Sequence, residues 1–174
     1  MLITLESDRL LLRPLVAGDE EMMFRNWTND PEVCRFLSWE PHGDISVTRA
    51  FLNYSLERYN DPKTVRFGIV YKPDGQLIGT IDAIEFFEGE AVEIGYCMGK
   101  AYWGKGIMTE AVGLVAAKLK ELGYSRLRIT AAVANIGSNR VAQKNGLALI
   151  CTEKREMRRK PGVIYEVNVY EKEL

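Results

Sequence analysis

One stretch, from Val92 to Val115, constrains this chain more than any other. Its first part is apolar except for Glu93, and this apolar run predicts a buried strand. Its last part has apolar residues at helical spacing from Ile107 onward, which predicts a helix. The loop between them carries Gly104 and Gly106. Such a loop exposes backbone N–H groups at the positive end of a helix dipole, so it predicts a site for a phosphate or pyrophosphate.

The loop departs from two common nucleotide-binding patterns. The dinucleotide fingerprint G-x-G-x-x-G has Thr109 in place of its third glycine. The G-x-x-x-x-G-K-[ST] loop fits from Gly99 to Lys105, but Gly106 replaces the hydroxyl residue that would hold Mg²⁺. A nucleotide-binding protein is therefore a distant alternative.

The loop resembles that of the GNAT acetyltransferases, [QR]-x-x-G-x-[GA], except that Ala101 stands at the Gln/Arg position. The segment 135–147 resembles the later N-x-x-S…K-x-G-F stretch of that family. The opening D-R-L-L-L-R-P-L at 8–15, with Asp19 and with L-S-W at 37–39, resembles the ribosomal-protein N-terminal acetyltransferase subgroup. The resemblance covers nearly the whole chain in the expected order.

Patterning along the chain predicts a mixed α/β fold. We expect strands at 9–15, 65–71, 77–87, 92–98, 127–133, 147–157 and 163–170, and helices from Asp19 to 28, from Asp44 or Ser46 to 59, from Ile107 to 122 and at 137–145. The stretch 37–43 should be irregular, and turns are expected at 72–75 and 88–90. The strands at 92 and 127 are joined by a helix, so they should be parallel, while the rest of the sheet should be mainly antiparallel. The resemblance implies the GNAT (acyl-CoA N-acyltransferase) fold, with its first two helices over an acceptor cleft.

Length and composition indicate one domain, residues 1–174, with 47% hydrophobic residues to fill one core. The net charge of −1 predicts no general attraction to nucleic acid or membrane. No signal peptide and no run of about 20 apolar residues is evident. Cys34, Cys97 and Cys151 have neither disulfide nor metal spacing, so we expect no metal and a cytoplasmic protein.

The resemblance implies acetyl-CoA as cosubstrate. Backbone N–H groups of the loop and helix start should cradle its pyrophosphate, with Lys105 as a local charge and a hydroxyl from Thr109; these residues are Trp103, Gly104, Lys105, Gly106, Ile107, Met108 and Thr109. Main-chain groups of Cys97 and Met98 should pair with the pantetheine arm, and one N–H should polarise the acetyl carbonyl. Asn135 and Ser138 are implied contacts to the coenzyme, although both residue types also suit plain helix capping.

Glu93 is the candidate general base, because alternation along a strand places it on one face with Gly95 and Cys97. A salt-bridged structural carboxylate is its alternative, and Asp82 and Glu85 are other candidates for the base. Cys97 itself is better explained as a small core residue than as a nucleophile.

The general acid is where the resemblance fails. Many relatives have a tyrosine where this chain has Ala142, and Tyr96 or Tyr102 would have to substitute. A thiol of pKa about 8.5 leaves tolerably without a positioned acid, so activity is not excluded.

Two other features have ordinary explanations. His42, the single histidine, is expected on a surface loop, with contact to the acceptor as an alternative. The basic run of Lys154, Arg155, Arg158, Arg159 and Lys160 is expected to be a solvated hairpin, with an RNA or acidic-acceptor patch as an alternative.

Together these features predict an N-acetyltransferase that passes acetyl from acetyl-CoA directly to a primary amine, such as the N-terminus of a ribosomal protein. One alternative is an acetyltransferase for a small-molecule amine of the polyamine or aminoglycoside type. Another is a non-catalytic acyl-CoA binding or sensing module, for which Ala142 is the one hint. A homodimer is an alternative to a monomer.

Overall fold

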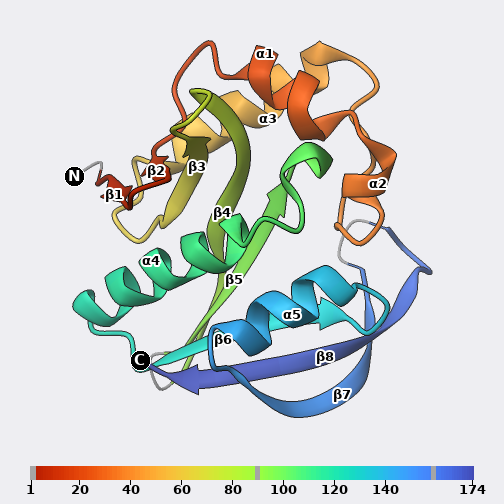
Figure 1. Ribbon diagram of the computed structural model, residues 1–174. Coiled ribbons are helices and arrows are strands. Elements are labelled where there is room, and N and C mark those ends of the chain that lie inside the picture. Colours follow the sequence, from red (N-terminus) through yellow and green to blue (C-terminus); the bar gives the residue numbers. More distant parts are fainter. Residues whose placement is uncertain (1–2, 89–90, 158–159) are drawn as a thin grey trace. The chain divides into compact units, whose positions relative to one another are not determined.

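The structure is a computed structural model that describes residues 3–88, 91–157 and 160–174, and Figure 1 shows its elements along the chain. The chain divides into two compact units, Met1–Asp82 with Tyr96–Lys105 and Ala83–Gly95 with Gly106–Leu174. Strands β4 (Gln76–Phe87) and β5 (Ala91–Met98) contribute residues to both units, because the chain passes from one unit to the other within them.

The first unit contains antiparallel strands and an apolar core. β1 (Leu5–Glu6), β2 (Leu10–Arg13), β3 (Arg66–Tyr71) and the first part of β4 follow one another in the sheet. The predicted turn before β4 is confirmed, since Gly75 has a φ of +67° and donates its N–H to the Tyr71 carbonyl at 2.9 Å. Part of the core of this unit is an apolar cluster of buried side chains: Leu15, Met23, Trp27, Val33, Leu52 and Leu77.

The helix expected from Asp19 to 28 is present as two contiguous pieces, and a short helix that was not expected follows it. α1 (Glu20–Met23) continues as a π-helix, η1 (Phe24–Thr28), and α2 (Pro31–Cys34) follows. Asp30 caps α2 by accepting the N–H of Glu32 at 2.8 Å, and the proline stands in its first turn. Asp-Pro therefore ends one helix and begins the next, because proline has no N–H to lose at the first helical position.

α3 (Ile45–Arg58) is the second expected helix, and Figure 1 shows it beside α1. Of the two caps suggested by the sequence, Asp44 is the one used, since its carboxylate accepts the N–H of Ser46 at 2.8 Å. The stretch before it, predicted to be irregular, contains no helix or strand.

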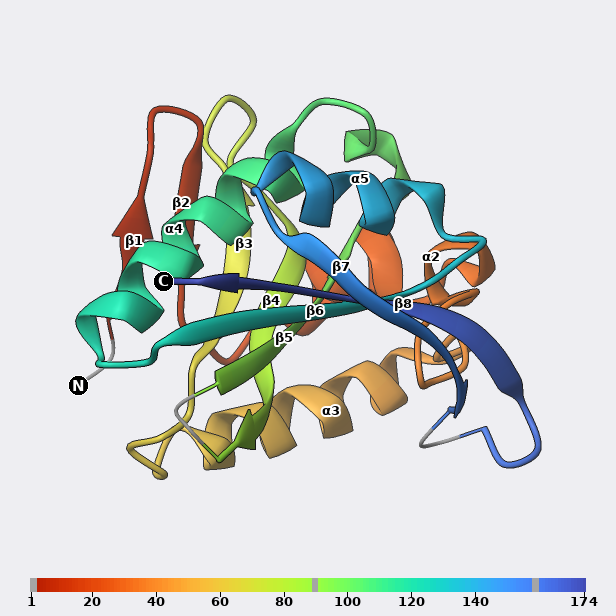
Figure 2. The same ribbon diagram turned by 90° about the horizontal axis from the view of Figure 1, so that it is seen from below.

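The second unit contains α4 (Ile107–Glu121), β6 (Arg126–Ala132), α5 (Ile136–Lys144), β7 (Ala148–Glu156) and β8 (Ile164–Glu173). Its strand order is β4-β5-β6-β8-β7. β5 pairs with β6 in parallel, and β6 with β8 and β8 with β7 antiparallel. Figure 2 shows β7 and β8 as one long twisted ribbon.

The expected mixed α/β class is confirmed. Among strand pairs whose register the structure describes, β5–β6 is parallel and the others are antiparallel, as the crossover through α4 predicts. The turn expected at 88–90 and the arginines expected in the closing hairpin fall partly on residues 89–90 and 158–159, outside the described residues. In the described part of the chain, every helix is too short or too polar to cross a membrane.

Candidate active site

The glycine loop enters α4 through two residues with left-handed backbone. Gly104 and Gly106 both have a φ of +74°, a conformation that favours glycine. Gly106 is the N-cap of α4 and provides no side-chain acceptor, so the N–H groups of the first turn, from Ile107 to Thr109, have no partner within the helix. The side chains of Ile107 and Met108 are buried, which anchors this helix start in its unit.

Within the first unit, the strand end and the loop are tied together by side chains. The indole Nε1 of Trp103 donates to the carbonyl of Met98 at 2.7 Å, although 45% of the Trp103 side chain is exposed. The ammonium of Lys105 lies 5.3 Å from the Tyr102 ring centroid, and the Lys105 carbonyl accepts from the Arg9 guanidinium at 3.1 Å. These contacts fix the loop geometry in advance of any ligand.

Cys97 is a packing residue, as the sequence suggested. Its thiol lies 3.5 Å from the Thr80 hydroxyl, and it packs against the core of the first unit. Burial raises the pKa of the Cys97 thiol to about 11. The main chain of β5 also comes close to β4 here, because a Cβ on Gly79 would meet the Cys97 carbonyl at 2.2 Å. A thiol this hard to ionise is unsuited to nucleophilic attack.

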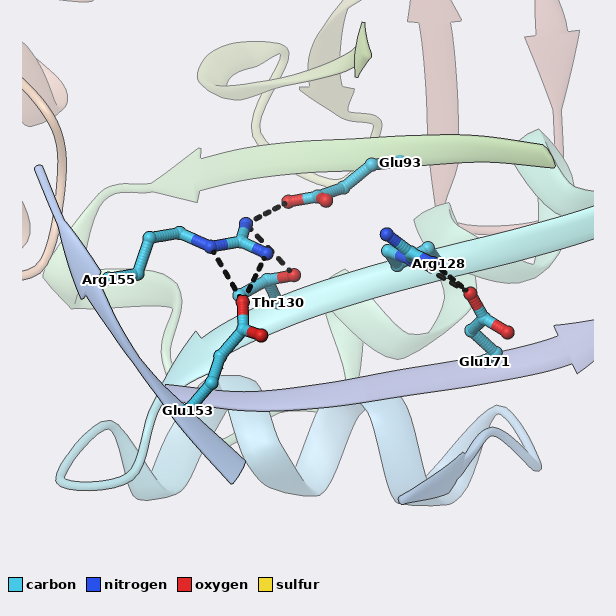
Figure 3. A network of polar contacts seen from close by, with 6 residues as sticks. All are labelled: Glu93, Arg128, Thr130, Glu153, Arg155 and Glu171. Carbon is cyan, nitrogen blue, oxygen red and sulfur yellow. Dashed lines mark hydrogen bonds and ion pairs between the residues drawn. The ribbon is translucent and has the colours of Figure 1, made fainter. Parts of the chain in front are cut away.

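Glu93 lies in the second unit, where it is 4% exposed and has an arginine partner. Arg155 Nη1 donates to Glu93 Oε1 at 3.4 Å and lies 3.5 Å from the Thr130 hydroxyl, while Nη2 of the same arginine bonds Glu153 at 2.9 Å. Figure 3 shows Arg155 reaching from β7 to the space between Glu93 and Thr130. The other carboxylate oxygen, Glu93 Oε2, is buried and has no hydrogen-bond partner among the described residues.

Glu93 stands at the last described residue pair between β5 and β6. The paired register of β5 with β6 ends at Glu93 and Arg128, so within this unit Ile94 and Gly95 continue β5 without a described pair on β6. Arg128 does not join the cluster, since it pairs with Glu171 at 2.5 Å and stacks on the Phe87 ring at 4.3 Å. Figure 3 shows the two arginines pointing to different carboxylates.

Arg155 differs from the expectation of a solvated basic run. Only 34% of its side chain is exposed, and its guanidinium forms ion pairs with Glu93 and Glu153. The strand alternation of β7 was the available signal, because Glu153 and Arg155 stand two residues apart on one face. Nothing in the sequence tied that face to Glu93.

Asn135 is the N-cap of α5, and Ser138 lies in the first turn of the same helix. The Asn135 side chain accepts the N–H of Ser138 at 3.2 Å, which confirms the capping alternative for Asn135. Further along, Asn145 Nδ2 donates to the Thr109 carbonyl at 3.2 Å and links the end of α5 to the start of α4. Within the second unit, this bond ties α5 to α4.

The other candidates for acid and base have partners of their own. Asp82 forms an ion pair with Arg66 at 2.9 Å, and burial raises the pKa of the Asp82 carboxyl. Tyr102 donates to Asp74 at 2.8 Å, and partial burial and this bond raise its pKa to about 12. Ala142 is fully buried within its unit, so this position is part of the packing of α5.

His42 is half-buried and does not lie free on a surface loop. Its Nδ1 lies 2.8 Å from the Thr48 hydroxyl, which lies 2.9 Å from the Thr28 hydroxyl. The ring packs 5.0 Å from Trp39, and burial lowers the pKa of the imidazole. The contacts explain the histidine as a residue that fastens its loop to α3. Among the described residues, no group of three or more His, Cys, Asp and Glu side chains is arranged to hold a metal ion.

Comparison with known proteins identifies the family. Residues 9–148 match the family model described as "Acetyltransferase (GNAT) domain". The chain belongs to the GNAT acetyltransferase family. It is therefore an acyltransferase, as the resemblance implied, and the match spans both the glycine loop and the segment from Asn135.

Relatives of this GNAT protein agree with that assignment. A probable N-acetyltransferase, YjcK of Bacillus subtilis, is 40% identical over 148 residues, 82% of each chain. The solved structure of microcin C7 self-immunity acetyltransferase MccE with acetyl-CoA and AMP has a TM-score of 0.84 at 24% identity, covering 97% of this chain and 94% of that one. RimL, a ribosomal L7/L12 N-acetyltransferase in complex with coenzyme A, has a TM-score of 0.84 at 19% identity, covering 99% and 98%.

Proposed function

We propose that this GNAT protein transfers the acetyl group of acetyl-CoA directly to a primary amine, and that this amine is a protein N-terminus, ribosomal proteins being the first to test. The start of α4 carries the proposal: Gly106 leaves it uncapped, and two glycines with positive φ lead into it. Such a helix start suits a pyrophosphate. The coenzyme complexes of MccE and RimL, proteins of the same fold, support acetyl-CoA as the ligand.

In this proposal the coenzyme is held by main-chain groups. The N–H groups from Trp103 to Met108 bind the pyrophosphate, with the Lys105 ammonium and the Thr109 hydroxyl as additional donors. The pantetheine arm pairs with the main chain at Cys97 and Met98. Since the Met98 carbonyl already accepts from Trp103, an N–H of these two residues is the proposed donor to the acetyl carbonyl. Asn135 and Ser138 are proposed contacts to the same arm.

The proposed chemistry needs one base. An ammonium group with a pKa of about 8, typical of a protein N-terminus, gives a proton to the Glu93 carboxylate directly or through one water. The amine lone pair attacks the acetyl carbon and forms the C–N bond, the attacking nitrogen loses its second proton to solvent, and the C–S bond breaks. The departing thiolate takes a proton from solvent, so the reaction yields the amide, free coenzyme A thiol and one net proton. With a thiol pKa of about 8.5, this step requires no tyrosine at Ala142.

The first test is thermal stability with and without acetyl-CoA. Ligand at about 100 times Kd stabilises the folded state by about 2.7 kcal/mol, which raises Tm by several degrees. ATP with Mg²⁺ is the matched control and should leave Tm unchanged. A shift with ATP and none with millimolar acetyl-CoA would reject the coenzyme site in favour of a nucleotide site.

The second test identifies the acceptor by amine-dependent release of coenzyme A thiol. We expect release with peptides that carry a free N-terminal alanine or serine, and none with the same peptides blocked at the N-terminus. Faster release with polyamines or aminoglycosides would assign the enzyme to small amines instead. Acetyl-CoA binding with no release on any amine would support the sensor alternative, and full activity of Glu93→Gln would move the base elsewhere.

A further inference from the structure

Three main-chain segments of the first unit meet so closely that no side chain fits between them. We call this place the junction, and its residues are Asn26, 77–79 and 97–99. A Cβ added to Gly79 would lie 2.2 Å from the Cys97 carbonyl oxygen, and one added to Gly99 would lie 2.5 Å from the Asn26 carbonyl oxygen. Both glycines are buried and neither has a positive φ, so close approach of the backbone is what requires them.

The peptide group between Met98 and Gly99 is bonded on both sides at the junction. Its carbonyl accepts from the indole of Trp103 at 2.7 Å, and its N–H donates to the carbonyl of Ile78 at 2.8 Å. A planar peptide group with both partners in place cannot rotate without losing a hydrogen bond. The orientation of the end of β5 is therefore set in part by Ile78 of β4.

Asn26 supports the β4 side of the junction. The register between β3 and β4 shifts between Ile69 and Val70, which makes Ile78 the extra residue of a bulge. The amide of Asn26 donates to the carbonyl of Leu77, the residue beside the bulge, at 2.7 Å. Asn26 is the central residue of the π-helical turn η1, and turns of this kind are frequent at functional sites.

Resting on the proposed function, we propose that Asn26 is a positioning residue of the acetyl-transfer site. Its amide fixes the bulge of β4, and the bulge holds the peptide group between Met98 and Gly99. That peptide group in turn fixes the main chain at Cys97 and Met98, which is proposed to pair with the pantetheine arm and to donate to the acetyl carbonyl. Such a donor must be held accurately, because a misplacement of about 1 Å can lower the rate by about 100-fold.

The test compares two ligands by calorimetric titration. One is acetyl-CoA, and the other is 3′-phosphoadenosine 5′-diphosphate, which is the part of coenzyme A without pantetheine. In Asn26→Ala and Asn26→Asp we expect the affinity for acetyl-CoA to fall by about tenfold, while the affinity for the pantetheine-free ligand stays within about twofold. Asn26→Asp keeps the size of the side chain but its carboxylate has no N–H to donate. Asn26→Gln keeps an amide donor and should restore part of the difference.

Gln76→Ala is the matched control for these variants. It removes another side-chain hydrogen bond between η1 and β4, from Arg25 to Gln76 at 2.7 Å, and it lies outside the junction. Both affinities should stay within about twofold of the wild type in this variant. Equal losses for the two ligands in the Asn26 variants, or no loss for acetyl-CoA, would overturn the proposal.

The same variants are compared in turnover at saturating acetyl-CoA and peptide. We expect kcat to fall by about tenfold or more in Asn26→Ala and Asn26→Asp and to stay within about twofold in Gln76→Ala, because the first two variants displace a donor to the acetyl carbonyl. A general loss of stability would lower Tm without changing kcat of the folded protein at saturation. A wild-type kcat in both Asn26 variants would therefore contradict the positioning role.

A further readout needs no ligand. Exchange of the Gly99 amide hydrogen, measured by NMR, should be about tenfold faster in Asn26→Ala than in the wild type and within about twofold of it in Gln76→Ala. Exchange at the wild-type rate in Asn26→Ala would show that Asn26 does not fix this peptide group and would overturn the proposal. If Asn26→Ala fails to fold, Asn26→Asp and Asn26→Gln carry the comparison.

These measurements separate the role of Asn26 from the proposed function. Wild-type protein that does not bind acetyl-CoA would reject both. Wild-type protein that binds and turns over acetyl-CoA, with Asn26 variants that match it, would reject the role of Asn26 alone. If the wild type binds acetyl-CoA and acetylates no amine, the proposed function fails, and the comparison of the two ligands still decides whether Asn26 positions the strand end.

Discussion

Individual residues of the opening motif turn out to have structural roles. Arg13 bonds both carboxylate oxygens of Asp19 at 2.8 Å, and Asp19 also accepts the N–H of Val16 at 2.8 Å. The carboxylate is almost fully buried within the first unit, with 3% of its side chain accessible. Arg13 and the later aspartate of this motif therefore form one bidentate ion pair that fixes the chain between β2 and α1.

Asp19→Ala should lower the free energy of unfolding by about 3–5 kcal/mol, because it leaves the Arg13 guanidinium without its partner in a largely buried setting. Glu21→Ala, an exposed carboxylate two residues along, is the control and should change it by less than about 0.5 kcal/mol. Urea denaturation measures both. Equal losses in the two variants would contradict the structural role of the pair.

His42 should make stability depend on pH below neutrality. Burial lowers its pKa in the folded state, so below the usual value of about 6.5 the unfolded chain binds more protons and folding loses stability as pH falls. We expect Tm to fall more between pH 7.5 and 5.5 in the wild type than in His42→Gln. Because His42 is the single histidine, parallel curves for the two proteins would contradict the assignment.

At the scale of elements, the glycine loop before α4 can be compared with another turn that has the same backbone conformation. Gly104 and Gly75 have similar backbones, with φ of +74° and +67°, and at both positions an added Cβ would meet nothing within 4 Å. One stands in the glycine loop and the other in the hairpin before β4. Alanine variants at Gly104 and Gly75 therefore separate the stability lost to strained backbone from the affinity lost with a ligand contact.

Gly104→Ala and Gly75→Ala should each lower the free energy of unfolding by about 1–2 kcal/mol, because alanine is strained in left-handed backbone. Only Gly104→Ala should also weaken acetyl-CoA binding, by about tenfold or more, since the methyl group occupies space that the pyrophosphate approaches. Calorimetric titration measures the affinity. Equal affinity in both variants would show that the loop is a turn without a ligand role.

Sequence reasoning predicted the elements that follow strong local signals. The strand–loop–helix stretch, the parallel crossover, the Asp44 cap and the Gly75 turn are all confirmed. The π-helical geometry of η1 and the short helix α2 were not predicted, because apolar spacing does not distinguish a π-helical turn from an α-helical one.

The candidate site was predictable only where a motif is local. The glycine loop is one such motif, whereas the pairing of Glu93 with Arg155 joins residues 62 positions apart in the chain. Periodicity shows that a side chain faces inward but not what it meets there. The same limit applies to His42, whose partner Thr48 lies on the next helix.

At the scale of the whole molecule, the three cysteines report on folding. All are free, with Cys34 buried, Cys97 half-buried and Cys151 exposed. Since burial raises the pKa of Cys97 to about 11, only about one Cys97 thiol in a thousand is ionised at pH 8. The protein should therefore present one reactive thiol when folded and three when unfolded.

We expect a thiol reagent at pH 8 to label one equivalent quickly and two more only on addition of denaturant. Cys151→Ser should abolish the fast phase, because it removes the exposed thiol, and it gives the background needed for assays of coenzyme A release. Labelling of Cys97 as fast as Cys151 in the native protein would contradict the packing found for β5.

The strand β5 also limits how sequences of this kind can change length. Glu93, Gly95 and Cys97 occupy alternate positions, so inserting or deleting one residue between Glu93 and Cys97 would turn one of these side chains to the opposite face. The turn at Lys72–Gly75 is under no such restriction. Over evolutionary time, insertions and deletions should accumulate in turns of this kind, while the four-residue spacing within β5 stays fixed.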